Sequence, residues 1–244
     1  DIDDGVIEAT LTGHDSAISA IAFDTSSNRI ATADEEGELR IWSIESGVVQ
    51  SRLEAHDGAI NDMIFDTSGQ LLITASNDGS IRKWNADKGS ERTDLRIPIK
   101  RPVMKILLSS DGERIVSGLD DGSIQVWSMQ TGDQLSFLDG DGAAISDLNW
   151  STDGQRLIAV TTDGSIRSWN SVTWDPEIDL DGELLEESAS DMSHQFDRLA
   201  VVNNNRNISL HDVDTGDVMF TLRGNDHDID LLSFTPDETR LVAS

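Results

Sequence analysis

The segment Asp78-Gly79-Ser80-Ile81-Arg82-Lys83-Trp84 joins an acidic turn to a short apolar run that ends in tryptophan, and versions of it recur along the chain. The residues that close these runs are Trp42, Trp84, Trp127, Trp169 and His211, at steps of 42, 43, 42 and 42 residues. A fixed period of about 40 to 45 residues indicates a repeat architecture, and four short strands per period make one propeller blade. The sequence therefore predicts an all-β propeller of four-stranded antiparallel blades.

Each period holds four strand-sized runs between clusters of Gly, Asp, Asn and Ser. In the first repeat the runs cover residues 18–23, 29–33, 38–42 and 48–53. Runs of five or six residues between turn-forming residues are typical of strands, and no segment sustains a helical period long enough to compete. We therefore expect almost no helix.

The repeats are expected to form one domain, because each repeat buries its faces only against its neighbours. The blades are predicted at residues 13–53, 55–96, 98–138, 140–180 and 182–222, with a partial repeat at 224–244. In this register residues 6–11 align with the outer strand at 48–53, so the chain starts and stops inside blades. Since it also lacks an initiator methionine, we expect a fragment, incomplete at both ends, of a parent ring with six or seven blades.

Composition disfavours several classes of function. Lys and Arg total 18 against 46 Asp and Glu, a formal net charge of −28. Such a charge opposes binding to phosphate backbones, so neither nucleic acid nor an anionic membrane is expected as a partner. No run of about 18 apolar residues and no signal-peptide pattern occurs, and the cytoplasm is taken as the default compartment. Without cysteine, thiolate nucleophiles and thiolate metal sites are excluded, while the redox compartment stays open.

The acidity has two explanations, and both stay open. Aspartate suits the many tight turns of a propeller, because its short side chain caps local backbone N–H groups. A dense charge of one sign is also typical of a surface adapted to high salt, where ions screen the repulsion.

The residues Gly13-His14, Trp42, His56, Asp78 and Trp84 resemble the WD-repeat β-propeller family, and the resemblance covers essentially the whole chain. In that family a histidine after the outer strand, a Ser or Thr late in the second strand, an Asp in the next turn and the third-strand Trp form a hydrogen-bonded quartet. The resemblance implies that His56, Ser76, Asp78 and Trp84 form a complete structural quartet. It also implies partial quartets with the residues His14, Glu36, Trp42, Asp121, Trp127, Thr161, Asp163 and Trp169. The first repeat departs from the pattern with Asp34 in the hydroxyl place, and the fifth with His211 for Trp.

Two other chemistries are weaker interpretations. A His, Asp and Ser set is also typical of hydrolase triads, but these need an exposed nucleophile, an oxyanion site and a pocket, and here the residue types recur with the repeat. Three acidic, glycine-containing loops, at residues 139–142, 179–183 and 226–230, offer carboxylates for calcium but lack the twelve-residue spacing of a calcium loop. Solvated turns are the favoured interpretation, and no catalytic residue, metal site or cofactor is predicted.

The resemblance implies a rigid scaffold that binds protein or peptide partners on its loops. The loops before each innermost strand and the turns between second and third strands are expected to share one face. That candidate partner-binding face comprises Asp15, Ser16, Glu35, Asp57, Asn77, Lys100, Arg101, Asp120, Asp141, Thr162, Asp226 and His227. Lys100 and Arg101 form a basic island that could anchor an acidic group of a partner, although an irregular solvated loop would look the same.

Two further functions remain open from the sequence. The propeller could be a sensor or regulatory segment of a larger multidomain signalling protein, restraining a catalytic domain outside this sequence. An enzyme with its active site in the central channel is the third alternative, and no constellation of perturbed acids supports it.

Overall fold

The computed structural model describes residues 10–24, 28–151, 154–180, 190–193, 198–202, 206–212, 215, 217–224, 229, 232–235 and 239–243. Within these ranges the regular elements are strands, as predicted, and none is a helix. The chain divides into two compact units, residues 1–120 with 124–137 and residues 121–123 with 138–244. Each unit is described by itself, and the prediction of one domain in a six- or seven-bladed ring stays a prediction.

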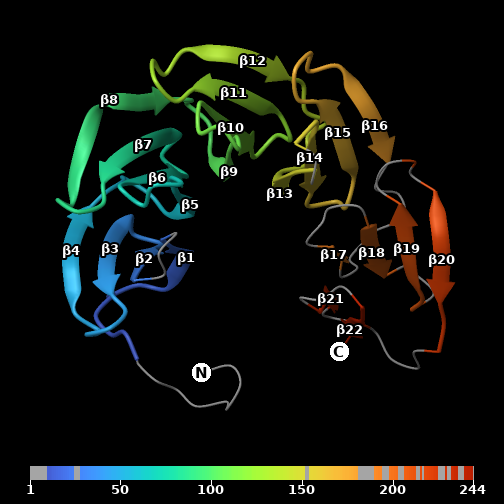
Figure 1. The fold of residues 1–244 in the computed structure, drawn as a ribbon, viewed down its shortest axis with the longest axis horizontal. Helices are drawn as coiled ribbons and strands as arrows, with labels where there is room; N and C mark the ends of the chain where they lie inside the picture. Colours follow the sequence, from blue (N-terminus) through green and yellow to red (C-terminus); the bar gives the residue numbers. More distant parts are fainter. Residues whose placement is uncertain are drawn as a thin grey trace. The chain divides into compact units, whose positions relative to one another are not determined.

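The first unit contains three four-stranded antiparallel sheets, each built from consecutive strands (Figure 1). The first sheet comprises β1 (Ile18–Phe23), β2 (Arg29–Asp34), β3 (Glu38–Ser43) and β4 (Val49–Glu54). The second comprises β5 (Ile60–Phe65), β6 (Leu71–Ser76), β7 (Ser80–Asn85) and β8 (Ser90–Pro98). The third comprises β9 (Val103–Leu108), β10 (Arg114–Leu119), β11 (Ile124–Ser128) and β12 (Gln134–Leu138), whose last residue falls in the second unit.

The second unit continues the pattern with two four-stranded sheets and one pair of strands. Its first sheet comprises β13 (Ile145–Trp150), β14 (Arg156–Thr161), β15 (Ile166–Asn170) and β16 (Pro176–Leu180). Its second comprises β17 (Ser190–Met192), β18 (Arg198–Val202), β19 (Ile208–Asp212) and β20 (Val218–Leu222). The pair is β21 (Leu232–Phe234) with β22 (Leu241–Ala243).

The strand pairing places every third-strand tryptophan at the same point of its sheet. Trp42 lies opposite Ile30, Trp84 opposite Leu72 and Trp127 opposite Ile115. The same register sets Trp169 opposite Leu157 and His211 opposite Leu199. A residue two positions beyond each partner therefore lies diagonally across from the indole on the same face of the sheet, within reach of a long side chain.

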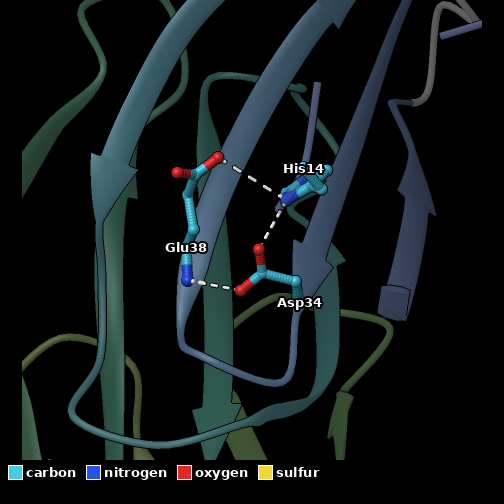
Figure 2. Close-up of side chains that lie close together, drawn as sticks. All are labelled: His14, Asp34 and Glu38. Atoms are coloured by element: carbon cyan, nitrogen blue, oxygen red, sulfur yellow. Dashed lines mark hydrogen bonds and ion pairs between the residues drawn. The ribbon is translucent and has the colours of Figure 1, made fainter. Parts of the chain in front are cut away.

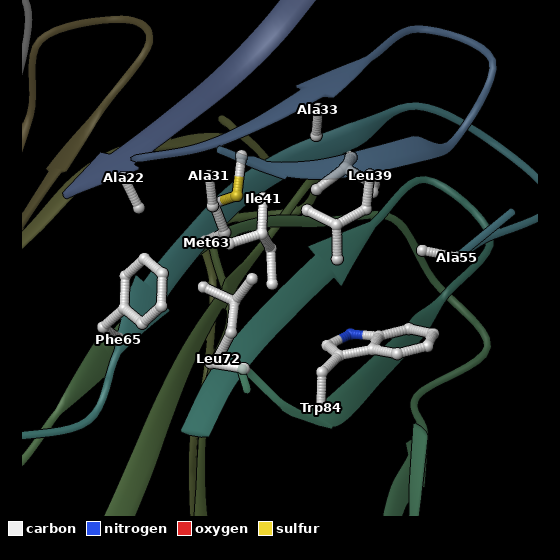
Figure 3. Close-up of a cluster of buried hydrophobic side chains, with 12 residues drawn as sticks. Ala22, Ala31, Ala33, Leu39, Ile41, Ala55, Met63, Phe65, Leu72 and Trp84 are labelled. Atoms are coloured by element: carbon white, nitrogen blue, oxygen red, sulfur yellow. The ribbon is translucent and has the colours of Figure 1, made fainter. Parts of the chain in front are cut away.

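The core of the first unit lies between successive sheets. Figure 3 shows the small side chains of β1 and β2, such as Ala31 and Ala33, facing Met63, Phe65 and Trp84 of the second sheet. The buried side chains of this cluster are at most 9% exposed, so each sheet is apolar where the next one covers it.

The innermost strand of the first sheet, β1, is more exposed than its equivalent in the second sheet, β5. Phe65 in β5 is 6% exposed, whereas Phe23, its equivalent one repeat earlier in β1, is 61% exposed. Among the described residues of the first unit, no sheet precedes β1. Burial of the innermost strands therefore depends on the neighbouring sheet rather than on the apolar residue itself.

Glycine in the turn between the second and third strands lets the next loop close against the blade. Gly37 has φ +86°, and a Cβ built there would lie 2.2 Å from the carbonyl oxygen of His56. The carbonyl oxygen of Gly37 accepts hydrogen bonds from the N–H groups of Ala55 and His56. A side chain at this position would force the two loops apart, which explains the acidic residue–Gly pattern of the turns.

The outer strand of the second sheet ends later than the sequence predicted. β8 extends to Pro98, whereas the predicted repeat ended at residue 96 and assigned residue 98 to the next repeat. Proline has no N–H to donate, and an edge strand leaves that group without a partner strand in any case. Extending β8 to Pro98 therefore costs no interstrand hydrogen bond.

Candidate functional site

A hydrogen-bonded chain of four side chains crosses the second sheet. The Nε1–H of Trp84 donates to Thr74 Oγ1 at 2.9 Å, and the same oxygen lies 2.7 Å from His56 Nε2. The other ring nitrogen, His56 Nδ1, lies 2.9 Å from Asp78 Oδ2. Because a carboxylate can only accept, Nδ1 carries the proton and the Thr74 hydroxyl donates to Nε2. Every donor and acceptor between indole and carboxylate is then satisfied.

The predicted hydroxyl of this quartet was wrong. The sequence indicated Ser76, but the hydroxyl between His56 and Trp84 belongs to Thr74. Trp84 lies opposite Leu72, so Thr74 is its diagonal neighbour, whereas Ser76 is two residues farther along the strand. Ser76 instead donates to the carbonyl oxygen of Gly58 and accepts the N–H of Asp78, which shapes the turn.

Asp78 is the anchor of the second-sheet network. Its carboxylate accepts from the N–H of Asp57 and from Ser80, and Arg82 Nη2 lies 3.3 Å from Oδ2. Burial alone would raise the pKa of Asp78, but the hydrogen bonds from His56 and Ser80 outweigh it and hold the pKa far below its ordinary value. The carboxylate therefore stays charged, which the neighbouring donors require.

The first sheet builds the same chain from a different carboxylate. Trp42 Nε1–H donates to Thr32 Oγ1, which lies 2.7 Å from His14 Nε2. His14 Nδ1 lies 2.8 Å from Asp34 Oδ2 at the end of β2 (Figure 2). The sequence had placed Glu36 in this partial quartet, and that was wrong. The Glu36 side chain is exposed, and its backbone N–H donates to Asp34.

Figure 2 also shows Glu38 beside this histidine, so His14, Asp34 and Glu38 offer three possible metal ligand atoms within 4.8 Å of one another. Both carboxylates are already engaged, since Glu38 accepts from Arg40 and Arg52. Burial favours the neutral form of Glu38, but these guanidinium groups prevail and lower its pKa. Two guanidinium charges at one ligand oppose a cation, so we interpret the cluster as a hydrogen-bond network.

The third sheet keeps only part of the network. Trp127 Nε1–H donates to Ser117 Oγ at 3.0 Å, and Asp121 accepts from Ser123. Lys100, in the loop before β9, occupies the position that His56 has in the loop before β5. The backbone N–H of Lys100 donates to Gly79 O, just as that of His56 donates to Gly37 O. The exposed lysine is not a counterpart of the buried histidine.

The fourth sheet departs further. Ala159 lies diagonally from Trp169, where the first three sheets carry a hydroxyl. Thr161 donates to Asp163 at 2.6 Å, and this hydrogen bond, against the opposing effect of burial, lowers the pKa of Asp163. Asp141, at the predicted histidine position, lies 3.5 Å from Arg167. Thr161 and Asp163 stabilise a turn, and the tryptophan is reached by a cation–π contact instead, since the Arg167 guanidinium lies 5.4 Å from the centroid of the Trp169 ring.

The buried hydroxyls do not suit nucleophilic catalysis. Thr74 is 0% exposed and Thr32 is 7% exposed, so a substrate cannot reach either oxygen. A hydrolase triad needs an accessible nucleophile beside a pocket. The His, Asp and hydroxyl sets of the first two sheets are therefore structural networks.

The predicted loop face is continuous across the first unit. The carbonyl oxygen of Gly37 accepts hydrogen bonds from backbone N–H groups of the loop before β5. The carbonyl oxygen of Gly79 accepts them in the same way from the loop before β9. Asn61 Nδ2 donates to Asn77 Oδ1 in the neighbouring turn, and Arg101 Nε donates to Asp120 Oδ1 at 2.9 Å. The exposed residues of this face are Asp15, Glu35, Asp57, Asn77, Lys100 and Arg101, with Ser16 and Asp120 half-buried.

In the second unit, Asp141 and Thr162 are exposed, and the N–H of Thr162 donates to Ala144 O as the corresponding turns do in the first unit. Asp226 and His227 lie outside the described residues.

The sequence model of the WD domain, G-beta repeat family matches residues 5–43, 47–85, 98–128 and 132–170, together more than half of the chain. The chain belongs to the WD-repeat family. The four-stranded antiparallel sheets that these residues form are accordingly WD-repeat blades, and the predicted family is confirmed. WD repeats generally mediate protein–protein interaction and are typically not enzymatic. A comparison with curated proteins finds no match.

Membrane insertion through a helix finds no support in the part of the chain that the structure describes. No helix there has the length and apolar character that crossing a bilayer requires.

One set of WD-repeat residues was missed from the sequence although a signal was present. Thr32, Thr74 and Ser117 recur at one register position, two residues beyond the strand partner of each tryptophan. A hydroxyl repeated at that diagonal position identifies the acceptor for the indole N–H.

Proposed function

We propose that this WD-repeat chain is a scaffold that binds a protein or peptide partner on the loop face of its first unit. The observation that carries the proposal is the continuity of this face. The turn of each of the first two blades is hydrogen-bonded to the loop that enters the next blade. Three blades thus present their loops on a backbone that is already fixed, which lowers the conformational cost of binding.

The charge of this face supports a partner with a specific arrangement of groups. Lys100 is exposed and has φ +68°, an uncommon conformation for a residue with a side chain. Arg101, beside it, is about half exposed and is oriented by Asp120. In a chain of net charge −28, these two cations form a local site for an acidic group of the partner.

Other exposed residues of the face are acidic and suit a basic group elsewhere in such a partner. Asp15 and Asp57 are exposed and lie beside the His14 and His56 networks, which hold their loops. Carboxylates at these positions suit basic or hydrogen-bond-donating side chains. We therefore expect a peptide with an acidic group for Lys100 and a basic group for the blades before it.

The experiment compares the proteins retained from a lysate by the wild type, by Lys100→Ala with Arg101→Ala, and by Lys88→Ala. Lys88 is an exposed lysine in the turn between β7 and β8, so its substitution removes one positive charge outside the predicted face, against two in the double variant. The expected result is a partner retained by the wild type and by Lys88→Ala but lost from the double variant. Retention by all three proteins, with equal unfolding midpoints, would contradict the proposed site.

A further inference from the structure

The outer strand of the third blade has an apolar face that the outer strand of the first blade does not have. Leu135 and Phe137 in β12 alternate along the strand and are 55% and 50% exposed. β12 is the last strand of its sheet, in the order β12-β11-β10-β9. Two apolar side chains therefore stand on a strand whose outer edge has no partner in that sheet.

Comparison with equivalent positions shows that β12 differs from β4 and β16, whereas β20 also exposes apolar side chains, among them Met219 and Phe220. By the repeat spacing, Leu135 and Phe137 correspond to Gln50 and Arg52 in β4, which are both exposed and polar. In β16 the corresponding sequence positions are Glu177 and Asp179. Charged side chains and proline are the usual protection of an edge strand, and β16 also begins with Pro176. β12 carries neither a charge nor a proline.

A groove adjoins the same strand at its start. It has a volume of about 490 Å³ and is lined by residues 112–114, residues 128–130 and Leu135. Leu135 is thus both a wall of the groove and one of the two apolar residues on the strand. Met129 adds a second apolar wall, and Arg114 adds a polar one. The groove is large enough for a side chain carried by a strand that pairs with β12.

The border of the groove is acidic. Asp111, Glu113 and Asp133 are exposed near its mouth, and the one arginine among its walls, Arg114, lies 3.9 Å from Asp111. The whole chain has a net charge of −28. A second copy of this chain would bring the same negative charge to the edge, whereas a basic segment would be attracted to it.

We propose that the β12 edge with its groove is a second docking surface, which takes an extended segment of a partner protein that alternates apolar and basic residues. The segment adds as a strand beside β12, so its main chain supplies the hydrogen bonds. Its apolar side chains cover Leu135 and Phe137, and its positive charge is attracted by the exposed carboxylates of Asp111, Glu113 and Asp133. The loop face does not share these residues, so this surface operates independently of it.

The test measures binding of a fluorescent heptapeptide that alternates lysine and valine to the full chain by anisotropy. The variant Leu135→Gln with Phe137→Thr takes the residues that β4 and β20 carry at the equivalent positions and leaves the net charge unchanged. Val172→Gln is the matched control, because Val172 is 80% exposed and lies in the second unit. A peptide of the same composition with its lysines and valines in separate blocks measures attraction by charge alone.

The expected result is about tenfold weaker binding of the alternating peptide to the double variant, with wild-type affinity for Val172→Gln. The block peptide should bind the wild type no better than it binds the double variant. Equal affinity of the wild type and the double variant, or no binding at all, overturns the proposal. Concentration-dependent dimerisation of the wild type that the double variant abolishes would also overturn it, because the occupant would then be a second copy.

Discussion

The first two blades place the same chain of groups in the same position of the sheet but take the carboxylate from different points of the sequence. In the second blade His56 meets Asp78, which lies in the turn after β6. In the first blade His14 meets Asp34, the last residue of β2. Asp34 is equivalent to Ser76, not to Asp78, by the repeat spacing. What the fold requires is an acceptor near Nδ1, and either register position can supply it.

A second difference follows from the first. Arg40 and Arg82 are equivalent, and each donates to the carbonyl oxygen of the residue before its histidine, Gly13 or Ala55. Arg82 also reaches Asp78, whereas Arg40 contacts Glu38. In the first blade, therefore, Asp34 contacts the histidine and Glu38 contacts the arginine, whereas in the second blade Asp78 makes both contacts.

The largest expected effect is that of Asp78→Ala. The substitution removes the charged acceptor of buried His56, whose Nδ1 is left with the longer 3.3 Å contact to Ser80 Oγ, and it removes the contacts of Asp78 to Ser80 and Arg82. The free energy of unfolding should therefore fall by about 3 kcal/mol. Urea unfolding measures the loss. Asp57→Ala, which removes an exposed carboxylate in the adjoining loop, should change the value by less than about 0.5 kcal/mol.

Thr74→Val is expected to cost about 2 kcal/mol, because it keeps the shape of the side chain but leaves the Trp84 N–H and His56 Nε2 without a partner in the core. Ser76→Ala removes two turn contacts to backbone groups and should cost about 1 kcal/mol. Unfolding midpoints of the two variants compare the assignments directly. A larger loss for Ser76→Ala than for Thr74→Val would restore the original prediction from the sequence.

The sequence was sufficient for the fold and for three of the four members of the second-blade network. The period of the tryptophan markers depends on blades that each bury their faces against the next, so spacing alone identifies the strands. The hydroxyl depends instead on which residue lies diagonally from the indole, which is a property of strand register. Thr74 and Ser76 differ by two positions, lie on the same face and are chemically alike, so the second repeat alone does not distinguish them. Only the recurrence of a hydroxyl at the position of Thr74 in the first three repeats does.

Asp34 could not be recognised for a related reason. The repeat spacing assigns it to the hydroxyl place and Glu36 to the carboxylate place, but the turn positions Asp34 Oδ1 to accept the N–H groups of Glu36 and Glu38. The backbone bonds orient the carboxylate toward His14 and leave Glu36 in solvent. For the predicted loop face, Asp226 and His227 stay predictions because they lie outside the described residues.

Asp34→Ala is expected to cost about 1.5 kcal/mol, whereas Glu36→Ala should stay within about 0.5 kcal/mol of the wild type. The reason is that Asp34 holds both the His14 ring and the turn, while Glu36 contributes only its backbone N–H. The loss is smaller than for Asp78 because Glu38 also faces the ring, 3.6 Å from Nδ1. Equal losses for the two variants in urea unfolding would mean that the first blade has no such network.

The smallest effect is the acid dependence of stability that Asp78 contributes. Its hydrogen bonds, opposed by burial, hold the folded-state pKa far below the value of about 4 expected in the unfolded chain. Below about pH 4 the unfolded chain binds a proton that the folded chain does not, so stability falls as the pH falls. Asp78→Asn cannot take up this proton. The loss of unfolding free energy between pH 7 and pH 3 should therefore be about 1 kcal/mol smaller in the variant than in the wild type. An identical loss in both proteins would show that Asp78 titrates alike in the folded and unfolded states, so that its contacts to His56 and Ser80 would not favour the charged form.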